Sequence, residues 1–318
     1  MRTRRPGQQG RGRSSPCSLP NEVYSAVQLR TLIPVALSLV LLGGTVAQAA
    51  DNPYERGPAP TNSSIEATRG SFAVSETSVS SLVTGFGGGT IYYPTGTSER
   101  FGAVVVFPGF IESSAQLVDW GPRLASNGFV TILANSTNGF IFPDQRSTEQ
   151  LQALDYVRSQ SAVASSPIHD KVDTSRSAVI GHSMGGGATL LSTTKGRADV
   201  KAAIPLAPWN LTTSYPADGT PTLVYACQSD LIAPAAQHAS PSYDGIPSTT
   251  KKAYVSIANA DHFCANSPTS SGGTIGKFAV AWLKRFVDDD QRYTPWICGA
   301  SMPTSGTTIN EVRTTCPF

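Results

Sequence analysis

The stretch VIGHSMGGG, from Val179 to Gly187, places Ser183 between two glycines in a G-x-S-x-G pattern. A serine on a sharp strand-to-helix turn needs small residues two positions before and after it, because the turn brings these backbone segments together. Gly181 and Gly185 meet that need, an apolar run precedes them and GGGATLLS can continue as a helix. The pattern therefore predicts that Ser183 is a nucleophile, and the alternative is a plain tight turn.

A serine hydroxyl becomes reactive when a histidine accepts its proton and a carboxylate orients that histidine. In folds that carry this kind of turn, the three residues occur along the chain in the order serine, acid, histidine. His262 follows an apolar run and precedes the last helical pattern, so we expect it to be the base. His238 lies in the polar segment AQHAS, where we expect a solvated side chain. Asp230 closely follows the run TLVYA and is the predicted acid; the competing acids are Asp218, Asp244 and Asp261.

The negative oxygen that develops during attack on an ester needs N–H donors. One should be the backbone N–H of Met184, directly after the nucleophile. The other should come from the loop after the run AVVVF, which reads Pro108-Gly109-Phe110-Ile111, with the Phe110 N–H as the expected donor.

Seven apolar, β-branched runs predict the strands that position these residues. Several of them lack polar alternation, as expected of strands covered on both faces. The predicted strands span residues 90–93, 103–107, 129–134, 177–180, 202–206, 222–226 and 253–257.

Helical patterns lie between these strands. Residues 147–150, STEQ, read as a capping box that begins a helix through LQALDYVRS. Near the end of the chain one apolar helix face is formed by Ile275, Phe278, Trp282 and Phe286. Strands alternating with helices predict an α/β fold with a mostly parallel central sheet flanked by helices.

The composition supports one large folded domain after an N-terminal extension. Apolar residues make up 40% of the 318 residues and charged residues 14%. Six arginines and one glutamate precede residue 50, so the remainder has 18 basic and 21 acidic residues and a net charge of −3. A slightly acidic body argues against nucleic acid as a partner.

Residues 1–49 have the layout of an extension ending in a secretory signal peptide. An apolar run at 32–46 follows Arg30 and precedes Ala47-Gln48-Ala49. The run is shorter than the ~20 residues a spanning helix needs and is broken by Pro34, which disfavours stable membrane insertion. We expect export with cleavage near Ala49, leaving residues 50–318 as a single catalytic domain.

Four cysteines follow the predicted cleavage site: Cys227, Cys264, Cys298 and Cys316. An even number in an oxidising compartment suggests two disulfides, with three possible pairings. A bridge between Cys227 and Cys264 would tie the loop of the predicted acid to that of the base. Zinc spacing is absent, and we expect the acidic run at 288–290 to be solvated rather than a metal site.

Several motifs together resemble the bacterial cutinases and poly(ethylene terephthalate) hydrolases of the α/β-hydrolase superfamily. They are GHSMGGG, PGF, LAPW, CQSD followed by AP, and DHFC, and the likeness runs from about residue 52 to 318. The resemblance implies an α/β-hydrolase fold, Ser183, His262 and Asp230 as the catalytic residues, and Phe110 and Met184 as the oxyanion donors. It also implies the disulfides Cys227–Cys264 and Cys298–Cys316, and no cofactor or metal.

The resemblance further implies a set of substrate contacts. Trp209 matches a tryptophan that stacks on an aromatic ring of the polymer, Ile232 an apolar wall position, and Phe110 an aromatic that packs on the substrate; Ile111 follows in the same loop. Some members most active on aromatic polyesters carry a tryptophan before the nucleophile and a serine after the base. His182 and Phe263 stand there instead, and we expect both to line and narrow the cleft.

Only residues 207–221 separate two predicted strands between which lipases of this fold often insert a lid. An open groove suits a polymeric or bulky ester, so we expect a secreted, monomeric, lidless serine esterase acting on polyesters. The alternatives are a carboxylesterase or triacylglycerol lipase for short or soluble esters, an acyltransferase, and a non-catalytic surface-binding relative. Because His262 must be neutral to accept a proton, activity should rise from acid toward mildly alkaline pH.

Overall fold

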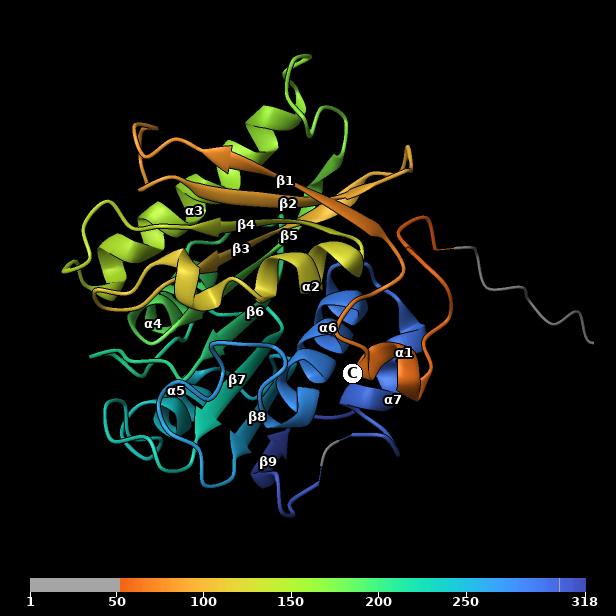
Figure 1. Ribbon diagram of the computed structural model, residues 1–318. Coiled ribbons are helices and arrows are strands. Elements are labelled where there is room, and N and C mark those ends of the chain that lie inside the picture. The colour runs from red at the N-terminus through yellow and green to blue at the C-terminus, as the bar shows by residue number, and fades with distance from the viewer. Residues whose placement is uncertain (1–51, 303) are drawn as a thin grey trace, which may run out of the picture. The chain divides into compact units, whose positions relative to one another are not determined.

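The computed structural model describes residues 52–302 and 304–318. Within them, a nine-stranded sheet has the order β1-β2-β4-β3-β5-β6-β7-β8-β9 (Figure 1). The strands are β1 Ala73–Val79, β2 Gly89–Thr95, β3 Phe101–Phe107, β4 Phe129–Ala134, β5 Val172–His182, β6 Val200–Leu206, β7 Thr222–Cys227, β8 Lys252–Ile257 and β9 Ile309–Thr314. Strands β3 to β8 pair in parallel, whereas β1, β2 and β9 pair antiparallel at the two ends of the sheet.

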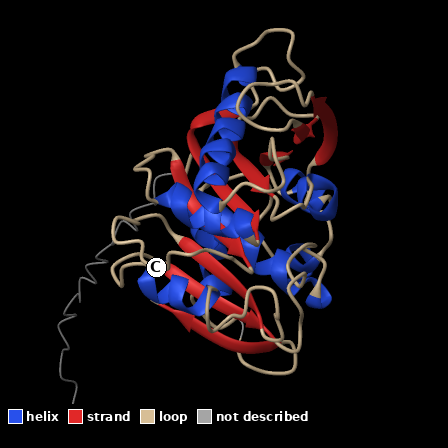
Figure 2. Cartoon of the chain, turned by 90° about the vertical axis from the view of Figure 1, so that its left-hand side faces the viewer, coloured by secondary structure: helices blue, strands red, loops and turns tan. Residues whose placement is uncertain are grey.

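Helices cover both faces of the sheet (Figure 2). They are α1 Asn62–Glu66, α2 Trp120–Ser126, α3 Pro143–Ser161, α4 Met184–Thr193, α5 Ala239–Gly245, α6 Thr274–Phe286 and α7 Thr294–Ile297. Helices α2 and α6 pack against one face with Val104 and Val106 of β3, while α3 packs on the other face with Val105. Consecutive β3 residues thus face opposite cores, which explains why the run AVVVF is apolar throughout.

All seven predicted strands lie within β2 to β8, and the predicted α/β class with a mostly parallel sheet is confirmed. The predicted start of α3 is wrong. The helix begins at Pro143 with Phe142 as its N-cap, and Ser147 lies inside it and donates to the carbonyl of Asp144. Proline is favoured in the first helical turn, because its missing N–H has no helical acceptor there, and this signal outweighs the capping box.

The acidic run after α6 also differs from expectation. Asp288 and Asp290 are fully buried. Asp288 forms ion pairs with Arg176 and Lys284, and Asp290 pairs with Arg292. Asp288 thus links the end of α6 to Arg176 of β5, and Asp290 pairs locally with Arg292; Asp289 is exposed, as expected of the run.

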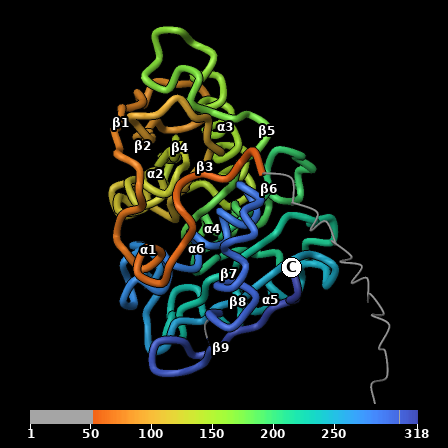
Figure 3. Tube along the Cα trace, turned by 90° about the vertical axis from the view of Figure 1, so that its right-hand side faces the viewer, coloured from red at the N-terminus to blue at the C-terminus, as the bar shows by residue number. Residues whose placement is uncertain are grey.

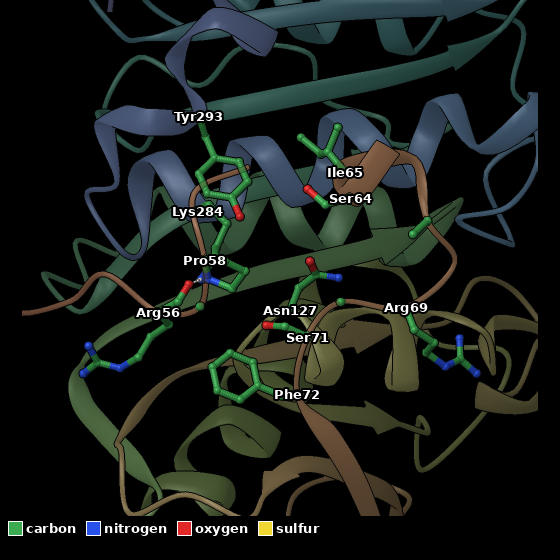
Figure 4. Close-up of a pocket in the computed structure, with 13 residues that line it drawn as sticks. Arg56, Pro58, Ser64, Ile65, Arg69, Ser71, Phe72, Asn127, Lys284 and Tyr293 are labelled. Carbon is green, nitrogen blue, oxygen red and sulfur yellow. Dashed lines mark hydrogen bonds between the residues drawn. The ribbon is translucent and has the colours of Figure 1, made fainter. Parts of the chain in front are cut away.

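The segment that leads to β1 packs beside the C-terminal part of the chain. Helix α1 lies next to α6 in both Figure 1 and Figure 3 and next to α7 in Figure 1, and Trp296 of α7 donates to Asn62. Between this segment and α6 lies a pocket of about 280 Å³, whose lining includes Arg56, Asn127 and Lys284 (Figure 4). None of the predicted catalytic or substrate-contacting residues lines this pocket.

No helix or strand occupies residues 207–221 between β6 and β7, which agrees with the expected lack of a lid. Among the described residues, no helix combines the length and apolar character needed to span a bilayer. The predicted signal peptide lies outside the described residues.

Candidate active site

Ser183 lies at the bend between β5, which ends at His182, and α4, which begins at Met184. Its φ of 54° and ψ of −119° are unfavourable for a residue with a side chain, and the surrounding structure holds them. The Ser183 N–H donates to the Leu206 carbonyl at 2.9 Å, and the Trp209 N–H donates to the Ser183 carbonyl at 2.8 Å. The bend is thus fixed by strand β6 and the loop that follows it.

The glycines around Ser183 are required by close backbone contacts. A Cβ on Gly181 would lie 2.2 Å from the carbonyl oxygen of Gly185. A Cβ on Gly185 would lie 2.4 Å from the carbonyl oxygen of Phe107, at the end of β3. Both distances are far inside van der Waals contact, so the predicted strand–turn–helix elbow depends on these two residues having no side chain.

Asp230 and His262 come together from the loops after β7 and β8. The Asp230 Oδ2 and His262 Nδ1 atoms are 2.6 Å apart, and both side chains are buried. The other carboxylate oxygen accepts from the backbone N–H groups of Ile232 and Ala233 at 2.8 and 2.7 Å. Burial alone would raise the pKa of Asp230, but these hydrogen bonds and the charge of a protonated His262 hold it below its ordinary value.

The His262 loop also lies against the residue that precedes Ser183. The His182 and His262 rings are 4.8 Å apart between centroids, and His182 Nε2 is 3.0 Å from the His262 carbonyl oxygen. Among the described residues, no hydrogen bond links the Ser183 hydroxyl to His262. Such bonds are often long in a free enzyme and shorten when substrate binds.

The competing residues are engaged elsewhere. His238 stacks against Trp209, with ring centroids 5.6 Å apart, and its Nδ1 lies 3.1 Å from the Asn210 carbonyl oxygen. Asp218 accepts from the Thr220 N–H and Asp244 pairs with Arg313. None of the described competitors, Asp261 included, contacts His262 Nδ1 as Asp230 does.

The loop after β3 approaches Ser183 closely at Gly109. A Cβ there would lie 2.7 Å from the Ser183 Cβ. The next residue is Phe110, and Met184 begins α4, whose first N–H groups have no acceptor within the helix. In the described part of the chain neither the Phe110 nor the Met184 N–H donates a hydrogen bond, so both are free to meet a developing oxyanion.

Exposed apolar side chains surround this site. Four of the six predicted substrate-contacting residues have about half or more of their surface exposed: Phe110 46%, Ile111 64%, Ile232 58% and Phe263 54%. Trp209 is half-buried, with its ring 6.1 Å from that of Phe142.

Two further aromatic residues lie beside the predicted substrate contacts and were not predicted from the sequence. Phe140 packs edge-on against Phe110, and Phe142 lies beside Trp209; both are more than half exposed. The segment NGFIFPD, with two aromatics just before a helix-starting proline, carried a signal that could have identified them.

His182 does not line the cleft as expected. Only 1% of its surface is exposed, and its Nδ1 lies 2.9 Å from Glu112 Oε2. Glu112 was not among the predicted site residues, because its partner is 70 positions away in the chain. Phe263 is exposed beside His262, with ring centroids 5.5 Å apart, so it is the residue that can narrow the groove.

Two disulfides join Cys227 to Cys264 and Cys298 to Cys316, as the resemblance implied. Cys227 is the last residue of β7, and Cys264 lies two residues after His262. The first bridge therefore connects the acid loop to the base loop.

A serine at a strand–helix bend, with an acid–histidine pair brought to the same end of a mostly parallel sheet, defines the α/β-hydrolase fold. The PETase family, described as PET hydrolase-like, matches residues 48–317. A bis(hydroxyethyl) terephthalate hydrolase of Streptomyces coelicolor is 51% identical over 291 residues, covering 90% of each chain. The cutinase est1 of Thermobifida alba is 46% identical over 86% of this chain and 89% of its own. A cutinase of Thermobifida fusca is 44% identical over 94% and 98%.

The chain belongs to the PET hydrolase-like family and is a carboxylic ester hydrolase.

Proposed function

We propose that this protein is an exported serine esterase that hydrolyses the ester bonds of polyesters. The observation that carries the proposal is the buried Asp230–His262 pair, 2.6 Å between Oδ2 and Nδ1, packed against the residue before a strained Ser183. The relatives named as cutinases and as a bis(hydroxyethyl) terephthalate hydrolase support aliphatic and aromatic polyester substrates.

In the proposed reaction the Ser183 oxygen attacks the ester carbonyl while His262 Nε2 takes the hydroxyl proton. The Phe110 and Met184 N–H groups donate to the carbonyl oxygen as it becomes negative. The carbon–oxygen bond to the alcohol then breaks, and His262 returns its proton to that oxygen. Water attacks the acyl-enzyme through the same base and releases the acid, so atoms and protons balance without a cofactor. Asp230 stabilises the protonated His262 in both steps.

The apolar rim supports a bulky substrate. Side chains such as Ile111, Phe140 and Ile232 are more than half exposed, which is costly in water unless they contact a ligand or a surface. We propose that Trp209 and Phe110 contact rings or methylene segments of the polymer. The absence of a folded insertion at 207–221 leaves this rim uncovered within the described residues.

A second candidate is hydrolysis of small soluble esters. Phe263, exposed next to His262, favours it because its ring can restrict a rigid polymer chain at the reacting bond. The most similar relative reported above also carries the name of a hydrolase for a small terephthalate diester.

The test uses protein purified from the medium of an expressing culture, with N-terminal sequencing to check cleavage near Ala49. Films of amorphous poly(ethylene terephthalate) and of an aliphatic polyester are incubated with it, and soluble products are quantified by chromatography. We expect products from both films, and a loss of about 10⁴-fold or more in Ser183→Ala. Turnover of a soluble diester without products from film would favour the second candidate. Activity retained in Ser183→Ala would contradict the proposed nucleophile.

A further inference from the structure

We propose that Glu112 is a positioning residue for ester hydrolysis, whose single buried carboxylate holds the oxyanion loop and the base loop in register with Ser183. The inference rests on the proposed function of Ser183, His262 and the Phe110 N–H. Five hydrogen bonds carry it: three are made by Glu112, one by Arg146 to the Pro108 carbonyl, and one joins His182 to the His262 carbonyl.

The first bond fixes the peptide before the predicted oxyanion donor. Glu112 Oε2 accepts from the Gly109 N–H at 2.6 Å. The carbonyl of the same peptide, that of Pro108, accepts from Arg146 Nη1 at 3.2 Å. The Pro108–Gly109 peptide is thus held at both ends by buried charged side chains. A rotation of this peptide would break both bonds, so the direction of the following Phe110 N–H is set by Glu112 and Arg146 together.

The second and third bonds reach the other two catalytic segments. Glu112 Oε2 lies 2.9 Å from His182 Nδ1, in the residue directly before Ser183. Glu112 Oε1 accepts from Asn266 Nδ2 at 2.8 Å, four residues beyond His262. One carboxylate therefore contacts the loops that supply an oxyanion donor, the nucleophile and the base.

The last bond links the His182 ring to the base loop. Its Nε2 faces the carbonyl oxygen of His262 at 3.0 Å, and a carbonyl can only accept, so Nε2 carries a proton. Its Nδ1 faces a carboxylate that already accepts the Gly109 N–H. Burial would raise the pKa of Glu112, but the hydrogen bonds and charge of His182 outweigh it and lower that pKa. Glu112 is therefore ionised, and the His182 ring bridges its carboxylate to the His262 carbonyl oxygen below the active site.

The charged groups around this pair are few. His182 and His262 lie on one side, and Arg146 on α3 is close enough for Glu112 to favour its charged form. The side chain of Glu112 is 7% exposed, so its charge is poorly screened and its bonds are strong. Removal of the carboxylate would leave the Gly109 N–H without its acceptor and His182 Nδ1 without its partner.

The experiment compares Glu112→Gln and Glu112→Ala with the wild type and with Glu311→Gln, a control whose side chain is 47% exposed beside Arg313. Kinetics with a soluble ester, the affinity of a boronic acid that forms a tetrahedral adduct with serine, and the melting temperature are measured for each. We expect kcat to fall about 10²-fold in both Glu112 variants, with KM within about twofold, because the loop acts on the transition state. Boronate affinity should fall by a similar factor, and the control should match the wild type.

The outcomes separate the two proposals. A wild type that hydrolyses no ester, or a Ser183→Ala variant that retains activity, would refute the proposed function itself. An active wild type with Glu112 variants that keep kcat and boronate affinity within threefold, whatever their melting temperature, would overturn the positioning role alone. If Glu112→Ala does not fold, His182→Gln replaces it, because it removes the same Glu112–His182 contact from the other side and must lower kcat comparably.

Discussion

Asp218 should make the protein less stable at neutral pH than it would be with an uncharged side chain. This residue, one of the competing acids, is 2% exposed in the loop before β7. Its Oδ1 accepts from the Thr220 N–H at 2.8 Å, while its Oδ2 has no hydrogen-bond partner among the described residues. Burial dominates and raises the pKa of Asp218 from 3.8 to about 6.

The sign and size of the effect follow from proton linkage. Between the two pKa values the folded protein binds more protons than the unfolded chain. The stabilising contribution of the protonated Asp218 carboxyl is therefore complete below about pH 3.8 and is lost as pH rises through about 6. A difference of about 2 pKa units corresponds to about 3 kcal/mol. Asp218→Asn keeps the Thr220 contact and removes the charge, so it should stabilise the protein by about 3 kcal/mol at pH 8 and hardly at all at pH 4.

Urea unfolding followed by tryptophan fluorescence at pH 4, 6 and 8 measures this difference. Asp244→Asn is the matched control, because the Asp244 side chain is 62% exposed and its change should be small at every pH. Ester hydrolysis should be unchanged in Asp218→Asn, since Asp218 does not contact His262. A stability difference that is independent of pH, or a variant less stable than the wild type at pH 8, would refute the reasoning.

Two further predictions concern the oxyanion loop and the buried ion pairs. Gly109→Ala should lower kcat about 10²-fold or more, because its Cβ would lie 2.7 Å from the Ser183 Cβ and must displace the loop; Gly306→Ala, with open space around it, is the control in the same kinetic assay. Asp288→Asn should cost about 3–5 kcal/mol in urea unfolding, because it leaves Arg176 and Lys284 buried beside an uncharged side chain. Asp289→Asn, with a side chain 68% exposed, should cost under about 1 kcal/mol, and equal losses in the two variants would contradict the argument.

The central strands and the acid–base pair could be predicted from the sequence because their signals are local. Strands covered on both faces must be apolar throughout, and the elbow must have glycines at 181 and 185, because a Cβ at either position would collide with a backbone carbonyl oxygen. Chain order after Ser183 leaves two histidines, and the positions of His262 and Asp230 after apolar runs favour them over the competing residues. The Asp230–His262 contact agrees with that prediction, and the catalytic roles stay predictions until they are tested.

The edge strands could not be predicted in the same way. β1 has the sequence AVSETSV and is mostly exposed or half-buried, and β9, INEVRT, has only its first residue buried. Both strands are stabilised by antiparallel pairing with β2 and β8, segments that are distant or separated by loops. Their own side chains therefore carry little of the apolar pattern by which a strand is recognised.

The predictions for two polar residues, Asp288 and His182, were wrong for a related reason. Asp288 reads as solvated and His182 as cleft-lining when only neighbours in the sequence are considered. Their partners, Arg176 and Glu112, lie 112 and 70 positions away. Whether a charged group is buried depends on such a partner, and no periodic pattern in the sequence encodes it.

The sheet alone does not position the acid and the base, because both lie on loops beyond its edge. Strands β7 and β8 pair in parallel up to Cys227 and Ile257, and the loops continue this pairing. Gln228 N–H donates to the Ile257 carbonyl at 2.9 Å, and Ser229 N–H donates to the Ala260 carbonyl at 2.8 Å.

The Cys227–Cys264 bridge then closes the base loop on its far side, so His262 lies between a hydrogen-bonded segment and a covalent tie. In the chain-entropy view, a bridge across 37 residues contributes about 4 kcal/mol. Because β7 and β8 already hold most of that span together, the bridge acts chiefly on the residues from 258 to 264. It therefore restricts the segment that carries His262.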